Sequence, residues 1–152
     1  MGHKVNPTGY RLGVNKHWQS KWFAGKDKYA DNLLSDLTLR VFIQKKLTNG
    51  GVAEVIIKRS IKKITIEVHV ARPGVVIGRG GAGIEELKKE LDKMIEGEVE
   101  LKILEVKRPE TSARLIAESV KSQVERRIVP KYASQREIEN AKNSGVIKGV
   151  RI

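Results

Sequence analysis

The sequence predicts an α+β fold in which a three-stranded sheet is packed by helices, followed by the start of a second small α/β domain. Strands are indicated at 52–58, at 64–71 and at 98–106, where apolar and polar residues alternate most clearly in the second segment. Helices are indicated where apolar residues recur at helical spacing, beginning near residues 31, 84 and 113. Glycine and proline residues separate these segments, so the predicted order is helix, strand, strand, glycine loop, helix, strand and two further helices.

Positive charge is the strongest compositional signal. The 152 residues include 30 Lys and Arg against 18 Asp and Glu, a formal net charge of +12. A field of this size attracts polyanions, of which nucleic acid is the commonest and an anionic membrane surface the next. The chain has no cysteine, which excludes disulfides, thiolate zinc sites and a cysteine nucleophile.

Several other classes of protein are disfavoured. The three histidines are scattered along the chain, so no metal site is predicted, and we expect no cofactor. The apolar runs are too short for a transmembrane helix or a signal-peptide core, which predicts a cytosolic protein without a membrane partner. Paired carboxylates and a nucleophile beside a base are also missing from the sequence, so an enzyme is not expected.

Residues 1–28 are predicted to form a basic arm. Six basic side chains stand there against a single acidic one, and the segment has no sustained periodicity. Lys4, Arg11 and Lys16 are candidate RNA contacts, because an irregular basic arm has little use without a polyanion. The aromatic residues at 18, 22 and 23 are expected to pack on the domain that follows rather than remain free.

That domain is predicted to span 29–107, and 108–152 would be the helical first part of the next one. In its first helix, five apolar residues lie near one face, which predicts the core side: Leu33, Leu34, Leu37, Val41 and Leu47. One continuous helix and two short ones split near Ser35 both fit this segment. In the helix after the glycine loop, the apolar face comprises Ile84, Leu87, Leu91 and Ile95.

The glycine loop at 78–83 admits two interpretations. Gly78, Gly80 and Gly83 satisfy the G-x-G-x-x-G spacing of a dinucleotide-binding turn, which would make the protein a nucleotide-dependent oxidoreductase. That turn needs a preceding buried strand, and Pro73 leaves only three residues for one.

The second interpretation is the G-x-x-G loop of a KH domain, formed by Gly78, Arg79, Gly80 and Gly81. Such a loop clamps about four nucleotides by their backbone and leaves the bases to a neighbouring apolar groove. Glycines let the backbone approach a phosphate, and Arg79 would neutralise it. A plain glycine turn is the structural alternative, but the order of elements in a basic chain favours a type II KH domain.

The turn between the first two strands is also basic. Lys62 and Lys63 lie at its tip, and a solvated turn and a phosphate contact are about equally compatible with them.

Beyond the loop, the whole chain resembles the bacterial small-subunit ribosomal protein S-three family. The resemblance rests on six segments in one continuous order: Met1-Gly2-His3-Lys4-Val5-Asn6-Pro7, Tyr10-Arg11-Leu12-Gly13, Trp22-Phe23-Ala24, Ala71-Arg72-Pro73-Gly74-Val75-Val76-Ile77-Gly78, Leu115-Ile116-Ala117-Glu118-Ser119, and Glu125-Arg126-Arg127. It covers essentially all 152 residues and is therefore much more specific than a lone G-x-x-G.

This resemblance implies a structural constituent of the small ribosomal subunit head. Such a protein binds small-subunit ribosomal RNA, contacts neighbouring head proteins and lines the channel by which mRNA enters. It implies RNA contacts by Arg72 and the glycine loop, and mRNA-channel contacts by Arg126, Arg127, Lys131 and Arg136. A KH-domain RNA-binding protein that acts outside the ribosome is the alternative function.

The chain departs from the family pattern in two places. Many relatives have a Phe-Arg-Arg run followed by a lysine one turn later, where this chain has Pro130-Lys131-Tyr132 and Gln135. Family members also continue through a further strand and turn, whereas this sequence ends after a strand-like segment at 146–152. We therefore expect a second domain that is incomplete within these 152 residues.

Overall fold

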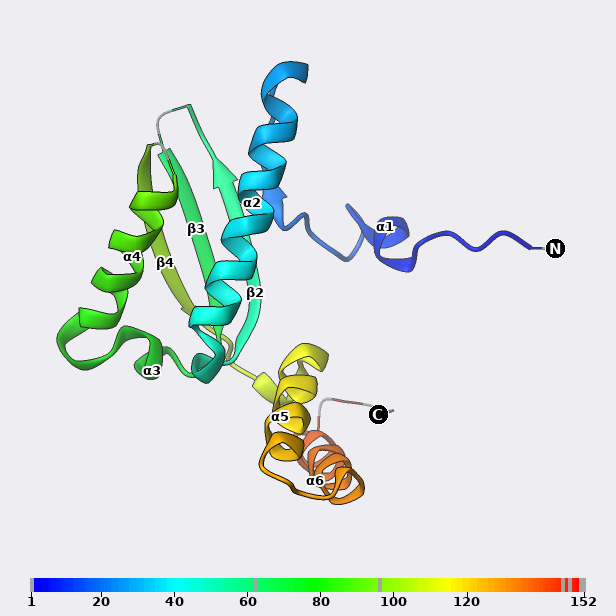
Figure 1. The fold of residues 1–152 in the computed structure, drawn as a ribbon. Coiled ribbons are helices and arrows are strands. Elements are labelled where there is room, and N and C mark those ends of the chain that lie inside the picture. Colours follow the sequence, from blue (N-terminus) through cyan, green and yellow to red (C-terminus); the bar gives the residue numbers. More distant parts are fainter. Residues whose placement is uncertain (1, 62, 96, 146, 148, 151–152) are drawn as a thin grey trace.

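The computed structural model describes residues 2–61, 63–95, 97–145, 147 and 149–150. A sheet with strand order β1-β2-β3-β4 is covered on one face by two helices, α2 (Lys26–Lys46) and α4 (Ala82–Met94). A second helical unit, α5 (Ala113–Glu125) and α6 (Pro130–Asn143), lies beyond one end of the sheet (Figure 1). The predicted α+β class and its helix-packed sheet are confirmed.

The sheet is built around one hairpin. β2 (Val52–Arg59) and β3 (Lys63–Val70) are antiparallel, and β4 (Glu98–Glu105) returns parallel to β3 after a helical crossover. The sequence prediction missed β1 (Ser20–Lys21), which pairs in parallel with the outer edge of β2. A strand of two residues is too short to show an alternating pattern in the sequence. The sheet therefore has four strands where three were predicted.

The hydrophobic core lies between the sheet and its two helices. Alternate residues of β3, from Ile64 to Val70, are buried, as the pattern at 64–71 predicts. Leu87 and Leu91 of α4 are buried against the sheet, on the face that the sequence predicts. On the solvent-exposed side of the two helices, the Lys46 amine of α2 forms an ion pair with Glu90 of α4 at 2.6 Å.

The core face of α2 differs from the prediction. The helix is continuous, and Leu34, Leu37 and Val41 are 62%, 52% and 50% exposed, whereas Leu39 and Ile43 are buried. The buried stripe consists of residues 36, 39, 43 and 47, so Leu47 is buried as predicted, whereas Leu33, Leu34, Leu37 and Val41 are not. Its first member is an aspartate, so an apolar pattern could not reveal it.

That aspartate attaches the N-terminal segment to the sheet. Asp36 is 1% exposed, and its Oδ1 accepts from the Arg59 guanidinium, with Nη2 at 2.7 Å and Nε at 2.8 Å. Its Oδ2 accepts from the Trp22 indole at 2.7 Å and from the Ser20 hydroxyl at 3.0 Å. A buried carboxylate is stable only when paired and hydrogen-bonded, and here the Arg59 charge and three hydrogen-bond donors from two separate segments satisfy it.

The aromatic residues of the arm have different environments. Trp22 is half-buried beside Tyr29, with ring centroids 5.4 Å apart, as expected for a residue packed on the domain. Trp18 and Phe23 are 61% and 97% exposed, so the expectation that they pack is wrong. A short helix, α1 (Pro7–Arg11), precedes them and is capped by the Asn6 carboxamide oxygen, which accepts from the Thr8 and Gly9 amides.

The helical pair at the C-terminal side forms where it is predicted. The short turn η3 (Pro109–Thr111) leads into α5, and α6 starts at Pro130, whose missing N–H costs nothing at this position. Glu137 of α6 accepts from Ser119 and Gln123 of α5, at 2.8 and 2.7 Å. The strand predicted at 146–152 falls mostly on residues 146, 148, 151 and 152, which lie outside the described residues.

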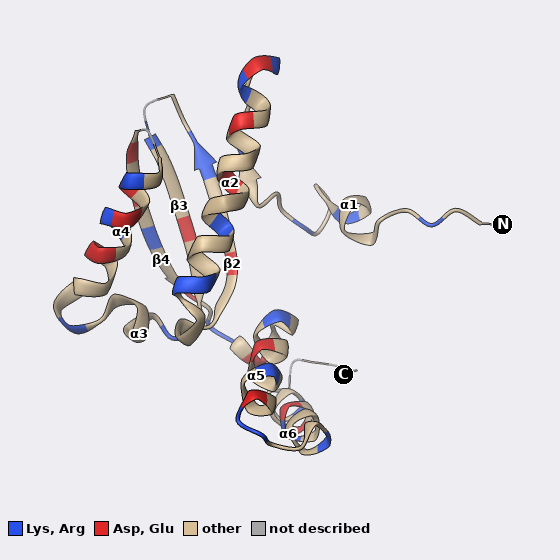
Figure 2. Cartoon of the chain, in the orientation of Figure 1, with Lys and Arg blue, Asp and Glu red and all other residues tan. Residues whose placement is uncertain are grey.

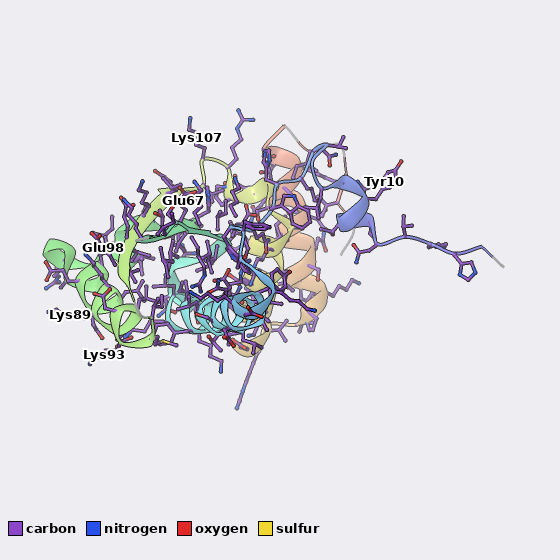
Figure 3. All side chains as sticks on the ribbon, turned by 90° about the horizontal axis from the view of Figure 1, so that it is seen from above. Tyr10, Glu67, Lys89, Lys93, Glu98 and Lys107 are labelled. Carbon is purple, nitrogen blue, oxygen red and sulfur yellow. The ribbon has the colours of Figure 1, made fainter. Side chains whose placement is uncertain are left out.

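The sheet face opposite α2 and α4 is polar and pairs its charges internally. Glu67 lies on this face (Figure 3) and accepts from Lys58 at 2.5 Å. Glu100 pairs with Lys63 at 2.7 Å. These lysines lower the pKa values of Glu67 and Glu100 by hydrogen bonding, and Glu100 in turn raises the pKa of Lys63.

Candidate nucleic-acid interface

The glycine loop connects two helices at one end of the sheet. α3 (Pro73–Ile77) follows β3, and Gly78 leads into a single turn, η2 (Arg79–Gly81), before α4. Pro73 sets the first turn of α3, since its fixed φ suits a helix start. The loop therefore has the helix–turn–helix form that the KH interpretation requires.

Three loop glycines adopt backbone conformations that other residues rarely reach. Gly78, Gly80 and Gly81 have φ values of +71°, +64° and +86°. Gly83 is needed for a different reason: a Cβ there would lie 2.5 Å from the carbonyl oxygen of Val76. Close packing of α3 against the start of α4 thus depends on this glycine.

The same geometry overturns the dinucleotide-binding interpretation. That turn must follow directly from a buried strand. Residues 73–77 form a helix, and β3 ends at Val70. The G-x-G-x-x-G spacing of Gly78, Gly80 and Gly83 is therefore incidental to the packing of two helices.

The loop presents positive charge without an internal partner. Arg79 and Arg72 are exposed, and within the described part of the chain neither forms an ion pair or side-chain hydrogen bond. The N-cap of α4 is Gly81, which offers no capping side chain. The positive end of the α4 dipole and its first amides thus lie beside the free guanidinium group of Arg79, an arrangement that favours an anion, while Arg72 precedes the other end of α3.

The basic hairpin tip lies at the opposite end of the sheet. Lys63 opens β3 and pairs with Glu100, so its charge is partly neutralised, while Lys62 lies outside the described residues. Arg59 points inward to Asp36. The structure therefore does not bring Lys63 together with Arg72 and the glycine loop.

The arm residues form a third basic region. Lys4, Arg11 and Lys16 are exposed on the segment that extends past the β1 edge, where Figure 2 shows basic residues with little acidic charge nearby. Arg11 donates to the Pro7 carbonyl at 3.1 Å, a contact that closes α1 without neutralising the charge.

Four basic residues gather around the turn between α5 and α6. Arg126 and Arg127 end α5, Lys131 lies in the first turn of α6 and Arg136 one to two turns later, and all four are exposed. Arg127 has φ +65° and is the one non-glycine residue with positive φ among the described residues. The amides of residues 127 and 128 bond back to the carbonyls of 124 and 123, the Schellman arrangement in which glycine is usual.

Asp36 and Arg40 lie beside the arm, and neither belongs to a motif that the sequence shows. Arg40 Nη1 donates to Gln19 at 2.7 Å and its Nη2 to Ser20 at 2.7 Å, and burial lowers the Arg40 pKa. The sequence signal that could have identified them is the helical spacing of residues 36, 39, 43 and 47. Asp36 belongs to this buried stripe, and Arg40 lies one turn after Asp36.

Comparison with known proteins agrees with this geometry. A family model described as "KH domain" matches residues 38–111. The small ribosomal subunit protein uS3 of Rhodospirillum centenum (strain ATCC 51521 / SW) is 50% identical over all 152 residues, which cover 67% of that relative. Proteins with the same name from Caulobacter sp. (strain K31) and Desulfatibacillum aliphaticivorans are 48% and 47% identical over the whole chain, covering 61% and 69% of those relatives.

Fold, loop and family match together define an RNA-binding KH domain of type II. The chain as a whole belongs to the uS3 family of small ribosomal subunit proteins. It spans about 61% of the length of the Caulobacter relative. The relatives carry the name of a ribosomal protein and not of an enzyme, in agreement with the expectation that the chain is not an enzyme.

Proposed function

We propose that this chain acts in the small ribosomal subunit, where it binds small-subunit ribosomal RNA through the glycine loop and the basic arm. The single observation that carries this proposal is the loop 78–81, in which positive-φ glycines hold the exposed Arg79 beside the N-terminus of α4 in a chain of the uS3 family. Backbone clamping of nucleotides needs close approach and positive charge, and the loop offers both. The predicted extents of arm, KH domain and C-terminal helices, 1–28, 29–107 and 108–152, are part of the same proposal.

The turn between α5 and α6 is proposed to line the channel by which mRNA enters. Support comes from the four exposed bases Arg126, Arg127, Lys131 and Arg136, gathered within one turn region. A left-handed arginine is costly by about 1–2 kcal/mol, and strain of this kind is commonly kept where a side chain is used. The proposed setting is the head of the small subunit, together with its neighbouring proteins. No helix among the described residues has the length and hydropathy to cross a membrane.

The test of the loop is a double substitution, Arg79→Asp with Gly80→Asp. No atom lies within 4 Å of a Cβ built at Gly80, and aspartate tolerates left-handed φ better than most residues, so the fold should persist. Phosphate repulsion should weaken binding to small-subunit ribosomal RNA at 150 mM salt by roughly tenfold or more, measured by filter binding.

The matched control is Lys88→Gln with Lys89→Asp on the exposed side of α4. It lowers the net charge by the same three units but leaves the loop intact. Equal losses in the two variants would show that only overall charge matters. Unchanged affinity of a folded loop variant would show that the loop is not the RNA contact.

A further inference from the structure

A cleft separates the N-terminal segment from α2, and the proposed function assigns no particular ligand group to it, although Lys16 of the basic arm lines it. Its walls include Lys16, His17 and Trp18 from the arm, Leu37 and Arg40 from α2, and Glu54 from β2. The cleft measures about 760 Å³, within the range of roughly 300–1,000 Å³ that small-molecule sites occupy. The residues that line it belong to the N-terminal segment, β1, α2 and β2, and the N-terminal segment lies away from both the glycine loop and the α5–α6 turn (Figure 1).

Trp18 supplies an unused aromatic surface at this cleft. The two tryptophans of the arm differ in role, because Trp22 is anchored through Asp36 whereas Trp18 is 61% exposed. Trp18 forms no side-chain hydrogen bond or ring stack with another described residue. An exposed indole offers a flat face on which a nucleic-acid base can stack.

The backbone of residues 11–16, which precedes Trp18 and carries Lys16, is already folded. The Arg11 carbonyl accepts from the amides of Val14, Asn15 and Lys16 at 3.0–3.2 Å, and the Gly13 amide returns to the Lys16 carbonyl at 3.0 Å. Few conformations would therefore be lost when a ligand enters, which lowers the cost of binding.

Charge at the cleft favours a nucleotide over an uncharged ligand. Lys16 is exposed at the rim and has no ion-pair partner among the described residues, while Arg40 is held in the floor by Gln19 and Ser20. Of the two acids that line it, Asp36 is already neutralised by Arg59. The carboxylate of Glu54 remains as a hydrogen-bond acceptor. It can accept from the amino group of a base, but it cannot donate to a phosphate.

We propose that this cleft binds one unpaired nucleotide of RNA, with the base stacked on Trp18 and a phosphate opposite Lys16. The inference rests on the proposed function, in which the basic arm binds RNA, and it assigns to one part of that arm a site for a single nucleotide. A base inside a duplex is stacked on both faces and paired along one edge, so only a single-stranded or bulged position can enter.

The experiment uses the full chain and two probes: a ten-nucleotide RNA without self-complementarity, and the blunt duplex of the same sequence. Trp18→Ala should weaken single-strand binding roughly 5- to 150-fold, measured by fluorescence anisotropy, and leave duplex binding unchanged. Trp18→Phe should retain most of the affinity because a stacking face remains. The matched control is Phe23→Ala, another exposed arm aromatic, which does not line the cleft and should have no effect.

A second measurement requires no substitution. Single-stranded RNA should quench the tryptophan emission of the unmodified chain, and the duplex should not. Absence of quenching, unchanged single-strand affinity of Trp18→Ala, or an equal loss on both probes would each overturn the cleft proposal. An unmodified chain that binds neither probe would overturn the proposed function as well, so the two failures can be told apart.

Discussion

Substituting Asp36 tests whether one buried carboxylate holds the arm, α2 and the hairpin together. In Asp36→Ala, the Arg59 guanidinium, whose side chain is only 13% exposed, loses its counter-ion, and the donors of Ser20 and Trp22 lose their acceptor. Removing one partner of a buried ion pair costs about 3–5 kcal/mol. With a urea m-value of about 2 kcal/mol/M, the unfolding midpoint should fall by roughly 2 M.

The assay is urea unfolding of the full chain, followed by far-UV circular dichroism and tryptophan emission. Asp31→Ala is the matched control, because Asp31 lies on the same helix but is exposed and forms no side-chain hydrogen bond or ion pair among the described residues. It should change stability by less than about 0.5 kcal/mol. If Asp36→Ala unfolded at the same urea concentration as Asp31→Ala, the network would be an incidental contact and the attachment of the arm would need another explanation.

Three further predictions concern the loop, the α5–α6 turn and the open sheet face. Gly83→Ala should destabilise the chain by about 1–3 kcal/mol in thermal unfolding because its methyl group meets backbone, whereas Gly74→Ala, a helical glycine in open space, should be neutral or stabilising. Arg127→Gly should raise stability by about 1 kcal/mol and yet weaken mRNA binding, and a gain in both would remove the functional reason for the strain. Glu67 and Glu100 have pKa values lowered in the folded state, so their stabilisation is present above the ordinary value of 4.5 and is lost as the pH falls below it. Denaturation midpoints at pH 6 and pH 3 should therefore differ less in the Glu67→Gln, Glu100→Gln double variant than in the unmodified chain.

The features that local pattern determines were predictable. Strict alternation located β3, and a single apolar stripe located the buried face of α4. Pro130 and Gly145 marked the ends of α6, because proline suits a helix start and glycine reaches the positive φ of a helix end. The glycine loop was also predictable, since its conformation depends on its own residues.

Features that depend on distant partners were not predictable. Two stripes of α2 have helical spacing, and the buried one contains Asp36, whose charge is satisfied by Arg59, far along the chain. β1 exists only because the edge of β2 is available to it. The cleft beside Trp18 likewise requires that the arm fold back toward α2, which no local pattern indicates.

The most direct test of the central proposal is sedimentation of a lysate that contains this chain, at low and at moderate salt. A chain that acts in the small subunit should co-migrate with that subunit and remain there at moderate salt, and the Arg79→Asp, Gly80→Asp variant should be depleted from it. Migration at the top of the gradient, free of subunits at both salt concentrations, would contradict the proposal and favour a KH-domain RNA-binding protein that acts outside the ribosome.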